Sequence, residues 1–259
     1  MNKRSHRAKK HLGQHFLSNK KILEEIVRVA ELSPKDTVLE VGPGLGSLTE
    51  TLAQKAKRVV AIEKDRDLIP ILQEKFKNDK NVEIVEGDVL KITWKGKYKI
   101  VANLPYYITS RFLRLFLSNP QSRPALLVLM VQREIAERIL AKNGKESLLS
   151  ISVKAYAKPE LIRHISKNNF SPPPKVDSAI IKLTPNKLTD NTPLKIMGAR
   201  EVTQTEQILS FARAAFQQKR KMLRHSIGKS VNLPPKYENM RPEDLSLDDW
   251  ARIFLYSQP

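Results

Sequence analysis

The segment Asn103-Leu104-Pro105-Tyr106 combines residue types that can hold an aromatic amine. The amino nitrogen of adenine is a poor nucleophile, because its lone pair is delocalised into the ring. The amide oxygen of Asn103 and the carbonyl of Leu104, which the following proline fixes, can both accept hydrogen bonds from such an amino group. Tyr106 offers a ring face on which a base or a sulfonium cation can stack. These four residues predict group transfer to an exocyclic amine, although a strand-ending turn with a buried tyrosine would also fit them.

A glycine-rich segment, Glu40-Val41-Gly42-Pro43-Gly44-Leu45-Gly46, lies between an expected strand over Thr37–Val41 and an expected helix over Ser47–Lys57. Glycines at a strand-to-helix turn let the backbone approach a ligand closely at the carboxyl end of a sheet. The spacing here is G-x-G-x-G, whereas the dinucleotide-binding pattern is G-x-G-x-x-G. An ordinary tight turn would also use one or two glycines, so the segment predicts a ligand site only in combination with other residues.

Two acidic residues follow the next two expected strands. Glu63 ends the second strand, where a carboxylate can accept hydrogen bonds from both hydroxyls of a ribose. Asp88 follows the third strand, where it could contact the amino group of an adenine. Together with the glycine segment, the two acids predict a site for an adenosine-containing cofactor. These residues leave nicotinamide and sulfonium chemistry equally open.

The order of elements along the chain would bring these residues together. Strands are expected over Thr37–Val41, Val59–Glu63, Val82–Val85, Ile100–Ala102 and Leu126–Val131, with helices over Ser47–Lys57, Asp67–Phe76, Ser110–Leu117 and Glu134–Leu140 between and after them. Strands separated by helices imply right-handed crossovers and a mostly parallel, doubly wound sheet. We therefore expect an α/β protein with a Rossmann-like fold and the site at the carboxyl ends of its strands.

The segments on either side of this alternation predict further elements. Ser18 is expected to cap an N-terminal helix whose apolar residues recur at helical spacing. Two later strands are expected over Leu149–Ala157 and Ala179–Leu183, joined through Leu161–Ser166 and a proline-rich stretch. Because no long helix lies between them, they predict an antiparallel edge of the sheet.

The pattern changes near residue 185. Asn186–Thr192 is polar and turn-prone, and helical periodicity dominates the ranges Gln204–Gln217, Lys219–Ile227 and Pro242–Leu255. We expect a catalytic domain over residues 1–185 and a small C-terminal helical domain over residues 186–259.

The net charge of +19 on 259 residues favours a polyanionic partner, most commonly nucleic acid. The charge is concentrated in two segments that hold no acid. The basic residues of these segments are Lys3, Arg4, Arg7, Lys9 and Lys10 in the first and Arg213, Lys219, Arg220, Lys221, Arg224 and Lys229 in the second. Such clustering indicates an RNA- or DNA-binding surface more than a uniformly basic coat.

Several classes of protein are disfavoured by the composition. The chain has no cysteine, so disulfides and cysteine nucleophiles are excluded, and its five histidines lack metal-ligand spacing. No apolar run reaches the roughly 20 residues of a membrane span. The N-terminus lacks the apolar core of a secretory signal, so a cytoplasmic location is expected.

Four separated segments carry a resemblance to a known family. They are Lys10-His11-Leu12-Gly13-Gln14-His15-Phe16-Leu17, Glu40 to Thr49, Asn103 to Ile108, and Phe170-Ser171-Pro172-Pro173-Pro174-Lys175-Val176-Asp177-Ser178. In this order they resemble class I methyltransferases that act on base amino groups. More narrowly, the chain is similar to the small-subunit (16S) ribosomal RNA adenine N6,N6-dimethyltransferases, the KsgA family, and the resemblance covers nearly its whole length.

The resemblance implies S-adenosyl-L-methionine as cofactor and a flipped adenine as methyl acceptor. Cofactor-binding residues implied in this way are Gln14, His15, Leu17, Gly42, Gly44, Glu63, Asp88, Val89 and Asn103. Catalytic residues so implied are Asn103, Leu104, Tyr106 and Phe170, with Phe170 stacking on the base opposite Tyr106. The family usually has asparagine where this chain has His15, so a main-chain contact is expected there. The reaction would be direct displacement at the sulfonium methyl carbon, without a metal or a general base.

Other functions remain open at this point. An Erm-type methyltransferase acting on large-subunit RNA shares the cofactor and acceptor segments, although the proline-rich segment favours the small-subunit family. A nicotinamide-dependent oxidoreductase is disfavoured by the glycine spacing. A non-catalytic RNA-binding assembly factor is disfavoured by the intact Asn103 segment. The expected partner is the ribosomal RNA of an immature small subunit, with the protein acting as a monomer.

Overall fold

The computed structural model describes residues 9, 13–142, 144–186 and 202–258. Of the basic N-terminal segment only Lys9 lies among them; the rest of that segment, His11, Leu12 and most of Asn186–Thr192 lie outside the described residues. None of the helices in the described ranges is both long and apolar enough to cross a membrane. The chain divides into two compact units, Met1–Ala136 with Glu160–Thr184 and Glu137–Pro159 with Pro185–Pro259.

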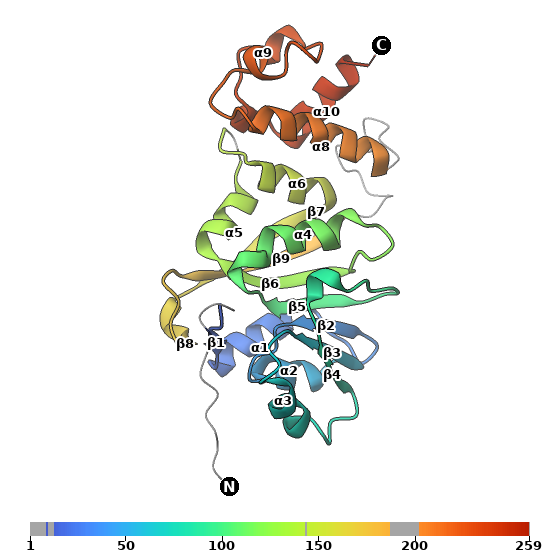
Figure 1. Ribbon diagram of the computed structural model, residues 1–259, viewed down its shortest axis with the longest axis vertical. Coiled ribbons are helices and arrows are strands. Elements are labelled where there is room, and N and C mark those ends of the chain that lie inside the picture. The colour runs from blue at the N-terminus through green and yellow to red at the C-terminus, as the bar shows by residue number, and fades with distance from the viewer. Residues whose placement is uncertain (1–8, 10–12, 143, 187–201, 259) are drawn as a thin grey trace. The chain divides into compact units, whose positions relative to one another are not determined.

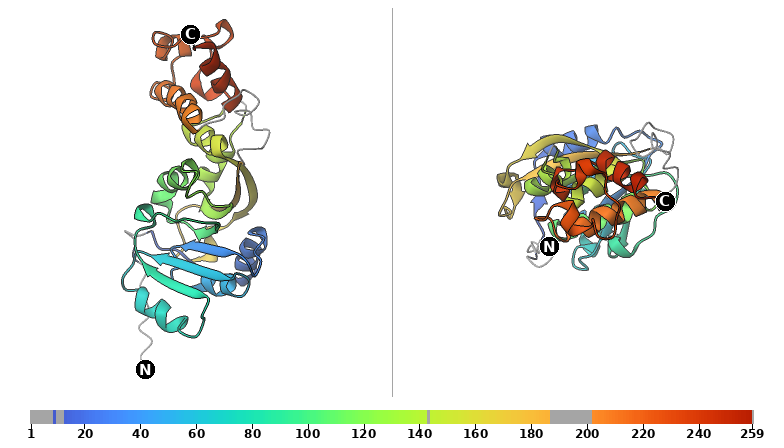
Figure 2. Two further views of the ribbon diagram at one scale, coloured as in Figure 1. Left: turned by 90° about the vertical axis from the view of Figure 1, so that its right-hand side faces the viewer. Right: turned by 90° about the horizontal axis from the view of Figure 1, so that it is seen from above.

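The first unit is built on a mostly parallel sheet, which confirms the predicted fold class. Within the described residues the sheet has seven strands in the order β4-β3-β2-β5-β6-β9-β7. Their bounds are β2 Thr37–Val41, β3 Arg58–Glu63, β4 Val82–Glu86, β5 Lys99–Asn103, β6 Leu126–Gln132, β7 Ala157–Ile165 and β9 Ser178–Pro185. Strands β2 to β6 run parallel and β9 is antiparallel to β6. The parallel strands lie side by side in Figures 1 and 2.

The strand order reverses between β2 and β5, which are neighbours in the sheet but far apart in the sequence. Chains that leave neighbouring strands on either side of such a point diverge, so a crevice opens at the carboxyl ends of the strands. The glycine segment follows β2, and Asn103 is the last residue of β5. The topology therefore places the predicted cofactor and acceptor segments at one crevice.

Helices follow the strands as the sequence predicts, although most of them begin or end at other residues than expected. Their bounds are α1 Lys20–Val29, α2 Ser47–Ala53, α3 Ile69–Lys75, α4 Thr109–Ser118 and α5 Arg133–Leu140. The expected cap of the first helix was wrong by one residue: Asn19, rather than Ser18, is the N-cap, and its side chain accepts from the Lys21 N–H at 3.2 Å. Both residue types cap helices well, so the sequence alone did not separate them.

The central strands of the sheet are covered on both faces. Val38 and Leu39 are successive residues of β2 that point to opposite faces, and both are fully buried. On one face Val38 packs in a core with Ile26 of α1 and Leu52 of α2. Burial on both faces explains why these strands read as continuous apolar runs rather than as alternating patterns.

A two-stranded ribbon outside the main sheet was missed by the sequence analysis. Strand β1, Phe16–Leu17, pairs antiparallel with β8, Phe170–Ser171, so that Leu17 lies opposite Phe170. The two strands lie together in Figure 1. Two-residue strands carry no detectable period, which is why the pairing of these segments was not predicted.

One expected strand was wrong. The range Leu149–Ala157 forms helix α6, Leu148–Tyr156, and the strand begins only at Ala157. Strand β7 thus includes most of Leu161–Ser166, which was expected to be a connection. Ser147 begins the helix with a capping box: its side chain accepts from the Ser150 N–H, and the Ser150 side chain accepts from the Ser147 N–H. This cap outweighs the strand preference of the β-branched residues that follow.

The second unit consists mainly of helices, orange to red in Figures 1 and 2 for its C-terminal part. Helix α6 packs on α8, Val202–Phe216, and on α10, Leu247–Tyr256. The range expected as one helix over Lys219–Ile227 contains only the short α9, Leu223–Ser226. The sequence analysis assigned residues 137–159 to the first domain, whereas here they pack with the C-terminal helices because α6 buries its apolar residues among them.

Candidate active site

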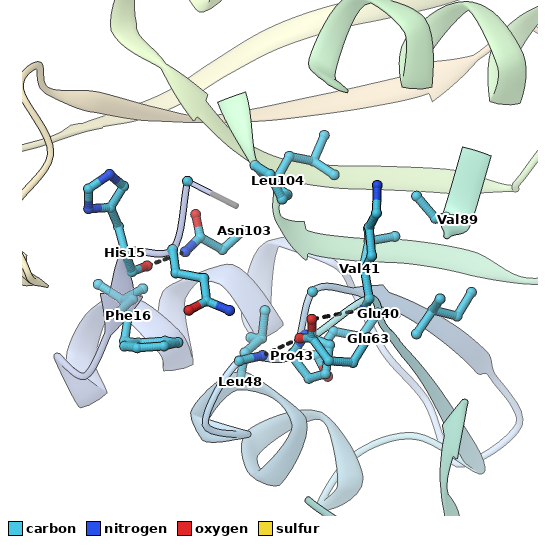
Figure 3. A pocket seen from close by; sticks show the side chains of 18 of the residues that line it. His15, Phe16, Glu40, Val41, Pro43, Leu48, Glu63, Val89, Asn103 and Leu104 are labelled. Atoms are coloured by element: carbon cyan, nitrogen blue, oxygen red, sulfur yellow. Dashed lines mark hydrogen bonds between the residues drawn. The ribbon is translucent and has the colours of Figure 1, made fainter. Parts of the chain in front are cut away.

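A cavity opens at the carboxyl ends of β2, β3 and β5 in the first unit (Figure 3). The predicted site residues that line it are Gln14, His15, Leu17, Gly42, Gly44, Glu63, Asp88, Val89, Asn103, Leu104 and Tyr106. Phe170 is the predicted site residue that does not line it. Segments from five separate parts of the sequence thus converge on one cavity.

The glycine segment brings the backbone close to an aromatic ring. Gly44 has a φ of +60°, and a Cβ atom there would lie 2.9 Å from Cδ1 of Phe16. Gly46 has a φ of +76°, and a Cβ there would lie 2.6 Å from the Phe76 ring. Side chains at either position would be strained and would also displace a ring. The glycines therefore allow Phe16 to pack against the turn at Gly44 and Phe76 to pack against it at Gly46.

The carboxylate of Glu63 is held by the backbone of the loops around it. Its Oε1 accepts from the N–H groups of Lys64 and Asp65, both at 2.8 Å, and its Oε2 accepts from the Gly44 N–H at 3.2 Å. Burial raises the pKa of Glu63, and these three donors oppose that rise. A carboxylate has about four lone-pair sites, so this arrangement leaves room for a hydroxyl donor such as ribose.

Asp88 follows β4 and is already engaged. Its Oδ1 accepts from the Leu90 N–H at 3.0 Å and its Oδ2 from the Lys64 ammonium at 3.1 Å. Burial alone would raise the pKa of Asp88, but these donors outweigh it and lower the pKa. The neighbouring Val89 is buried and lines the same end of the cavity.

Glu40 is a cavity residue to which the sequence analysis gave no role. Its side chain is 1% exposed, and its Oε2 has no hydrogen-bond partner among the described residues. Burial, and to a smaller extent the nearby Glu63 carboxylate, raise the pKa of Glu40 to about 8. A buried acceptor without a donor is costly, so this oxygen can gain a hydrogen bond from a group that enters the cavity. The sequence did show this acid, because Glu40 is the first residue of the glycine-rich segment.

The side chain of Asn103 faces the cavity and is fixed by the N-terminal segment. Its amide nitrogen donates to the main-chain oxygen of His15 at 3.1 Å (Figure 3). The next residue, Leu104, donates its N–H to the Met130 carbonyl of β6 at 3.1 Å, which ties the segment to the sheet. With its nitrogen engaged, Asn103 presents its amide oxygen as a hydrogen-bond acceptor.

Tyr106 is held at the end of the same segment. A hydrogen bond of 2.8 Å joins its hydroxyl to the Oγ of Ser178, which is fully buried at the start of β9. Burial raises the pKa of Tyr106. The ring of His15 stacks on Tyr106, with 6.0 Å between ring centroids and 24° between planes. Ser178 ends the proline-rich segment, and the sequence did not predict its contact with the site.

Phe170 lies in the core and does not line the cavity. It is 5% exposed and packs with Leu17 and Ile165. The Nδ1–H of His15 instead reaches this part of the chain by donating to the Pro172 carbonyl at 2.8 Å. The structure thus brings His15 next to Tyr106, and a stacking role for Phe170 stays a prediction.

Comparison with known proteins decides the family. A model of the ribosomal RNA adenine dimethylase family matches residues 5–258. The chain belongs to that family. A protein of Dehalococcoides mccartyi named ribosomal RNA small subunit methyltransferase A is 40% identical over 96% of this chain and 88% of its own length. One of Clostridium botulinum with the same name is 38% identical over 98% of this chain and 95% of its own length.

The solved structures of two methyl-transferring enzymes share the fold over 93% of this chain. A dimethyladenosine transferase from Plasmodium falciparum is 28% identical, with 96% of that chain covered and a TM-score of 0.79. The 23S rRNA methyltransferase ErmE is 26% identical, with 99% of that chain covered and a TM-score of 0.75. As a member of the dimethylase family, the protein is an rRNA adenine methyltransferase that uses S-adenosyl-L-methionine.

Proposed function

We propose that this family member dimethylates the N6 of adenines in small-subunit (16S) ribosomal RNA during ribosome assembly. The observation that carries the chemistry is the side chain of Asn103, which faces the cavity with its nitrogen bound to His15 and its oxygen left as acceptor. The names of the relatives at 38 to 40% identity support the small-subunit target.

The residues of the cavity fit the cofactor. Glu63 would accept ribose hydroxyls, Asp88 and Val89 would border the adenine, and the turn at Gly42 and Gly44 would border the methionine part. The unpartnered Oε2 of Glu40 would accept from the methionine ammonium group. Leu17 and the main chain of Gln14 and His15 would cover the cofactor from the N-terminal side. S-adenosyl-L-methionine supplies an electrophilic methyl group on a sulfonium.

Two acceptors would orient the target amine. The Asn103 amide oxygen and the Leu104 carbonyl would each accept one N–H of the adenine N6, which turns the nitrogen lone pair toward the methyl group. Holding the reacting atoms in line can contribute about 7–11 kcal/mol at most, which is the main source of rate that this mechanism offers. Tyr106, fixed through Ser178, would support the face of the base. Phe170, which does not line the cavity, would contact the base only through its remaining exposed edge or after a shift.

The RNA would be held through its phosphates. Lys219, Arg220, Lys221 and Arg224 are exposed in the second unit, and none of them forms an ion pair with an acid of the described residues. Free cations of this kind suit recognition of RNA shape rather than sequence. Flipping a paired adenine out would cost a few kcal/mol, which these contacts offset.

We further propose a cytoplasmic monomer that acts on the immature small subunit. The large exposed apolar side chains among the described residues are spread over separate elements, for example Ile71 of α3, Leu115 of α4 and Leu161 of β7. An Erm-type activity on large-subunit RNA is the second candidate, because ErmE shares the fold and 26% identity. The higher identity of the small-subunit relatives favours the first.

The deciding experiment is transfer of labelled methyl groups to immature small subunits and, in parallel, to protein-free large-subunit RNA. We expect two methyl groups per target adenine on the small-subunit substrate and none on the large-subunit RNA. Mapping the methylated adenines in cells with and without the protein gives the positions. Labelling of the large-subunit RNA alone would replace the proposal with the Erm-type activity.

A further inference from the structure

Asp65 is a buried acid next to the cavity that neither the cofactor contacts nor the acceptor contacts use. It lies two residues after Glu63, in the loop that follows β3, and its side chain is 1% exposed. Asp65 itself does not line the cavity. A carboxylate buried this deeply needs partners, and the partners come from the N-terminal segment.

Both oxygens of Asp65 hold that segment. The Lys9 ammonium donates to Oδ1 at 2.5 Å, and the Gln14 amide donates to Oδ2 at 2.7 Å. Lys9 also pairs with Asp67 at 2.7 Å, and its main-chain N–H donates to the Gln14 amide oxygen at 2.8 Å. Burial alone would raise the pKa of Asp65, but Lys9 and Gln14 outweigh it and lower the pKa. The carboxylate is therefore a charged anchor for two residues of one segment.

The anchored segment forms a wall of the cofactor cavity. We call residues 13–17 the strap; all five line the cavity, and the Phe16 ring lies against Gly44 of the glycine turn. At its C-terminal end the strap is fixed by the pairing of Leu17 with Phe170 and by the His15 carbonyl, which accepts from Asn103. At its N-terminal end Asp65 holds Gln14 of the strap and also binds the Lys9 ammonium.

Asp65 also connects the strap to the ribose end of the cavity. Its main-chain N–H donates to Oε1 of Glu63 at 2.8 Å, while its side chain holds Gln14. One residue thus orients the acid proposed to bind ribose and anchors the wall that would cover it. The strap forms one wall of the cavity, so its mobility would affect entry and exit of a ligand rather than the reacting atoms.

We propose that Asp65 is a positioning residue that latches the strap over the cofactor cavity through Lys9 and Gln14, and thereby sets the affinity and residence time of the cofactor. The role of the cavity as cofactor site rests on the proposed function; the latch itself rests on the contacts above. If the closed strap is the binding-competent state, the apparent dissociation constant rises in inverse proportion to the closed fraction.

The test uses Lys9, because its side chain is partly exposed and a change there does not disturb the core. Lys9→Met removes the ion pair, and Lys9→Arg keeps the charge. Lys77→Met is the matched control, because Lys77 forms an exposed pair with Glu74 at the same 2.5 Å, away from the cavity. Asp65→Asn is a second variant, which removes the negative charge that Lys9 and Gln14 bind. Binding and dissociation of S-adenosylhomocysteine are measured, together with hydrogen exchange of residues 13–17 without ligand.

For Lys9→Met we expect about tenfold weaker binding, faster dissociation and faster exchange in the strap, because the charge-assisted hydrogen bond to Asp65 is lost. The KM for the cofactor should rise while kcat changes less than twofold. Lys9→Arg should restore the affinity, and Lys77→Met should behave as the unchanged protein. Unchanged exchange and affinity in both Lys9→Met and Asp65→Asn would overturn the latch.

The outcome also separates the latch from the proposed function. If the unchanged protein fails to bind S-adenosylhomocysteine, the cofactor assignment of the cavity fails. Faster exchange of the strap in Lys9→Met would still establish the latch in that case. If the probe binds equally well to all variants while the strap exchanges faster, the cavity assignment stands and the proposed effect on the cofactor is wrong.

Discussion

The side-chain nitrogen of Asn103 lies 3.1 Å from the main-chain oxygen of His15 and donates to it, although the two residues are far apart in the sequence. An amide has one acceptor and one donor group, so fixing the nitrogen also fixes the direction of the oxygen. The strap therefore has a second part in the proposed mechanism: its backbone sets the orientation of the proposed amine acceptor. A carbonyl can do this whatever side chain stands at position 15, so the orientation does not depend on the histidine there.

Asn103→Asp tests this orientation more sharply than truncation does. The two side chains have the same shape, but a carboxylate cannot donate to the His15 carbonyl and would face it with a repulsive lone pair. We expect methyl transfer to fall about 10²–10³-fold, the range found when one oriented transition-state contact is removed. Single-turnover methylation of the small-subunit substrate measures it. RNA binding should be retained, and Asn78→Asp, at an exposed asparagine, should leave transfer unchanged. Transfer by Asn103→Asp at the normal rate would refute the orienting role.

The hydrogen bond between Tyr106 and Ser178 predicts coupled effects of two substitutions. Tyr106→Phe and Ser178→Ala each remove the bond that fixes the ring, and each should lower kcat/KM for RNA about three- to tenfold, as a net loss of about 0.5–1.5 kcal/mol implies. The double variant should be no worse than the more affected single variant, because the same bond is lost in all three. Additive losses would show that the two hydroxyls act separately. Thermal unfolding of each variant serves as the control for folding.

The raised pKa of Glu40 predicts that the folded protein loses stability as the pH rises. The folded-state pKa of about 8 lies above the ordinary value of 4.5, so the folded protein keeps a proton that the unfolded chain loses. The stability contributed by the protonated form is complete below about pH 4.5 and is lost as the pH rises toward 8. Glu40→Gln is neutral at every pH, so its unfolding temperature relative to the unchanged protein should increase between pH 5 and pH 8 in the absence of cofactor.

Ligand binding gives a second measurement on the same residue. An ammonium group placed against Glu40 favours the ionised carboxylate, so binding of S-adenosylhomocysteine at pH 7 should release a proton. Calorimetry in buffers of different ionisation enthalpy detects that release. The Glu40→Gln variant should bind more weakly and release none. Equal proton release from both proteins would show that the ammonium group binds elsewhere.

The sequence predicted the parts of the fold that repeat a strong local pattern. Buried parallel strands such as Leu126–Gln132 are recognisable as apolar runs, and the glycines before α2 mark a turn. The order of these elements along the chain implies the crevice. The strand expected over Leu149–Ala157 was wrong because α6 is apolar on most sides, so its residues show no helical period and their β-branched types suggest a strand. The cap at Ser147, just outside the apolar run, was the available signal.

The part of the site that the sequence could not predict consists of contacts between distant segments. Three contacts join residues that are far apart in the sequence: the Ser178 hydrogen bond, the Asp65 anchor and the β1–β8 ribbon. No sequence motif or residue spacing marks any of these contacts. The burial of Phe170 is of the same kind, because an aromatic residue before three prolines fits a core position as well as a stacking one. Motif positions indicate where a ligand binds, whereas the residues that hold the motif depend on tertiary packing.

The basic residues of the second unit predict how RNA affinity depends on salt. Lys219, Arg220 and Lys221 are exposed, and each phosphate contact that is lost should reduce the slope of log affinity against log salt by about 0.7 to 0.9. Replacing all three with Gln should therefore flatten the slope by about two to three and weaken binding across RNA sequences alike. The same replacement at Lys35, Lys55 and Lys57, exposed lysines of the first unit, lowers the net charge of +19 by the same three charges. If both triple variants flatten the slope equally, the effect belongs to the overall charge and the second unit holds no specific RNA surface.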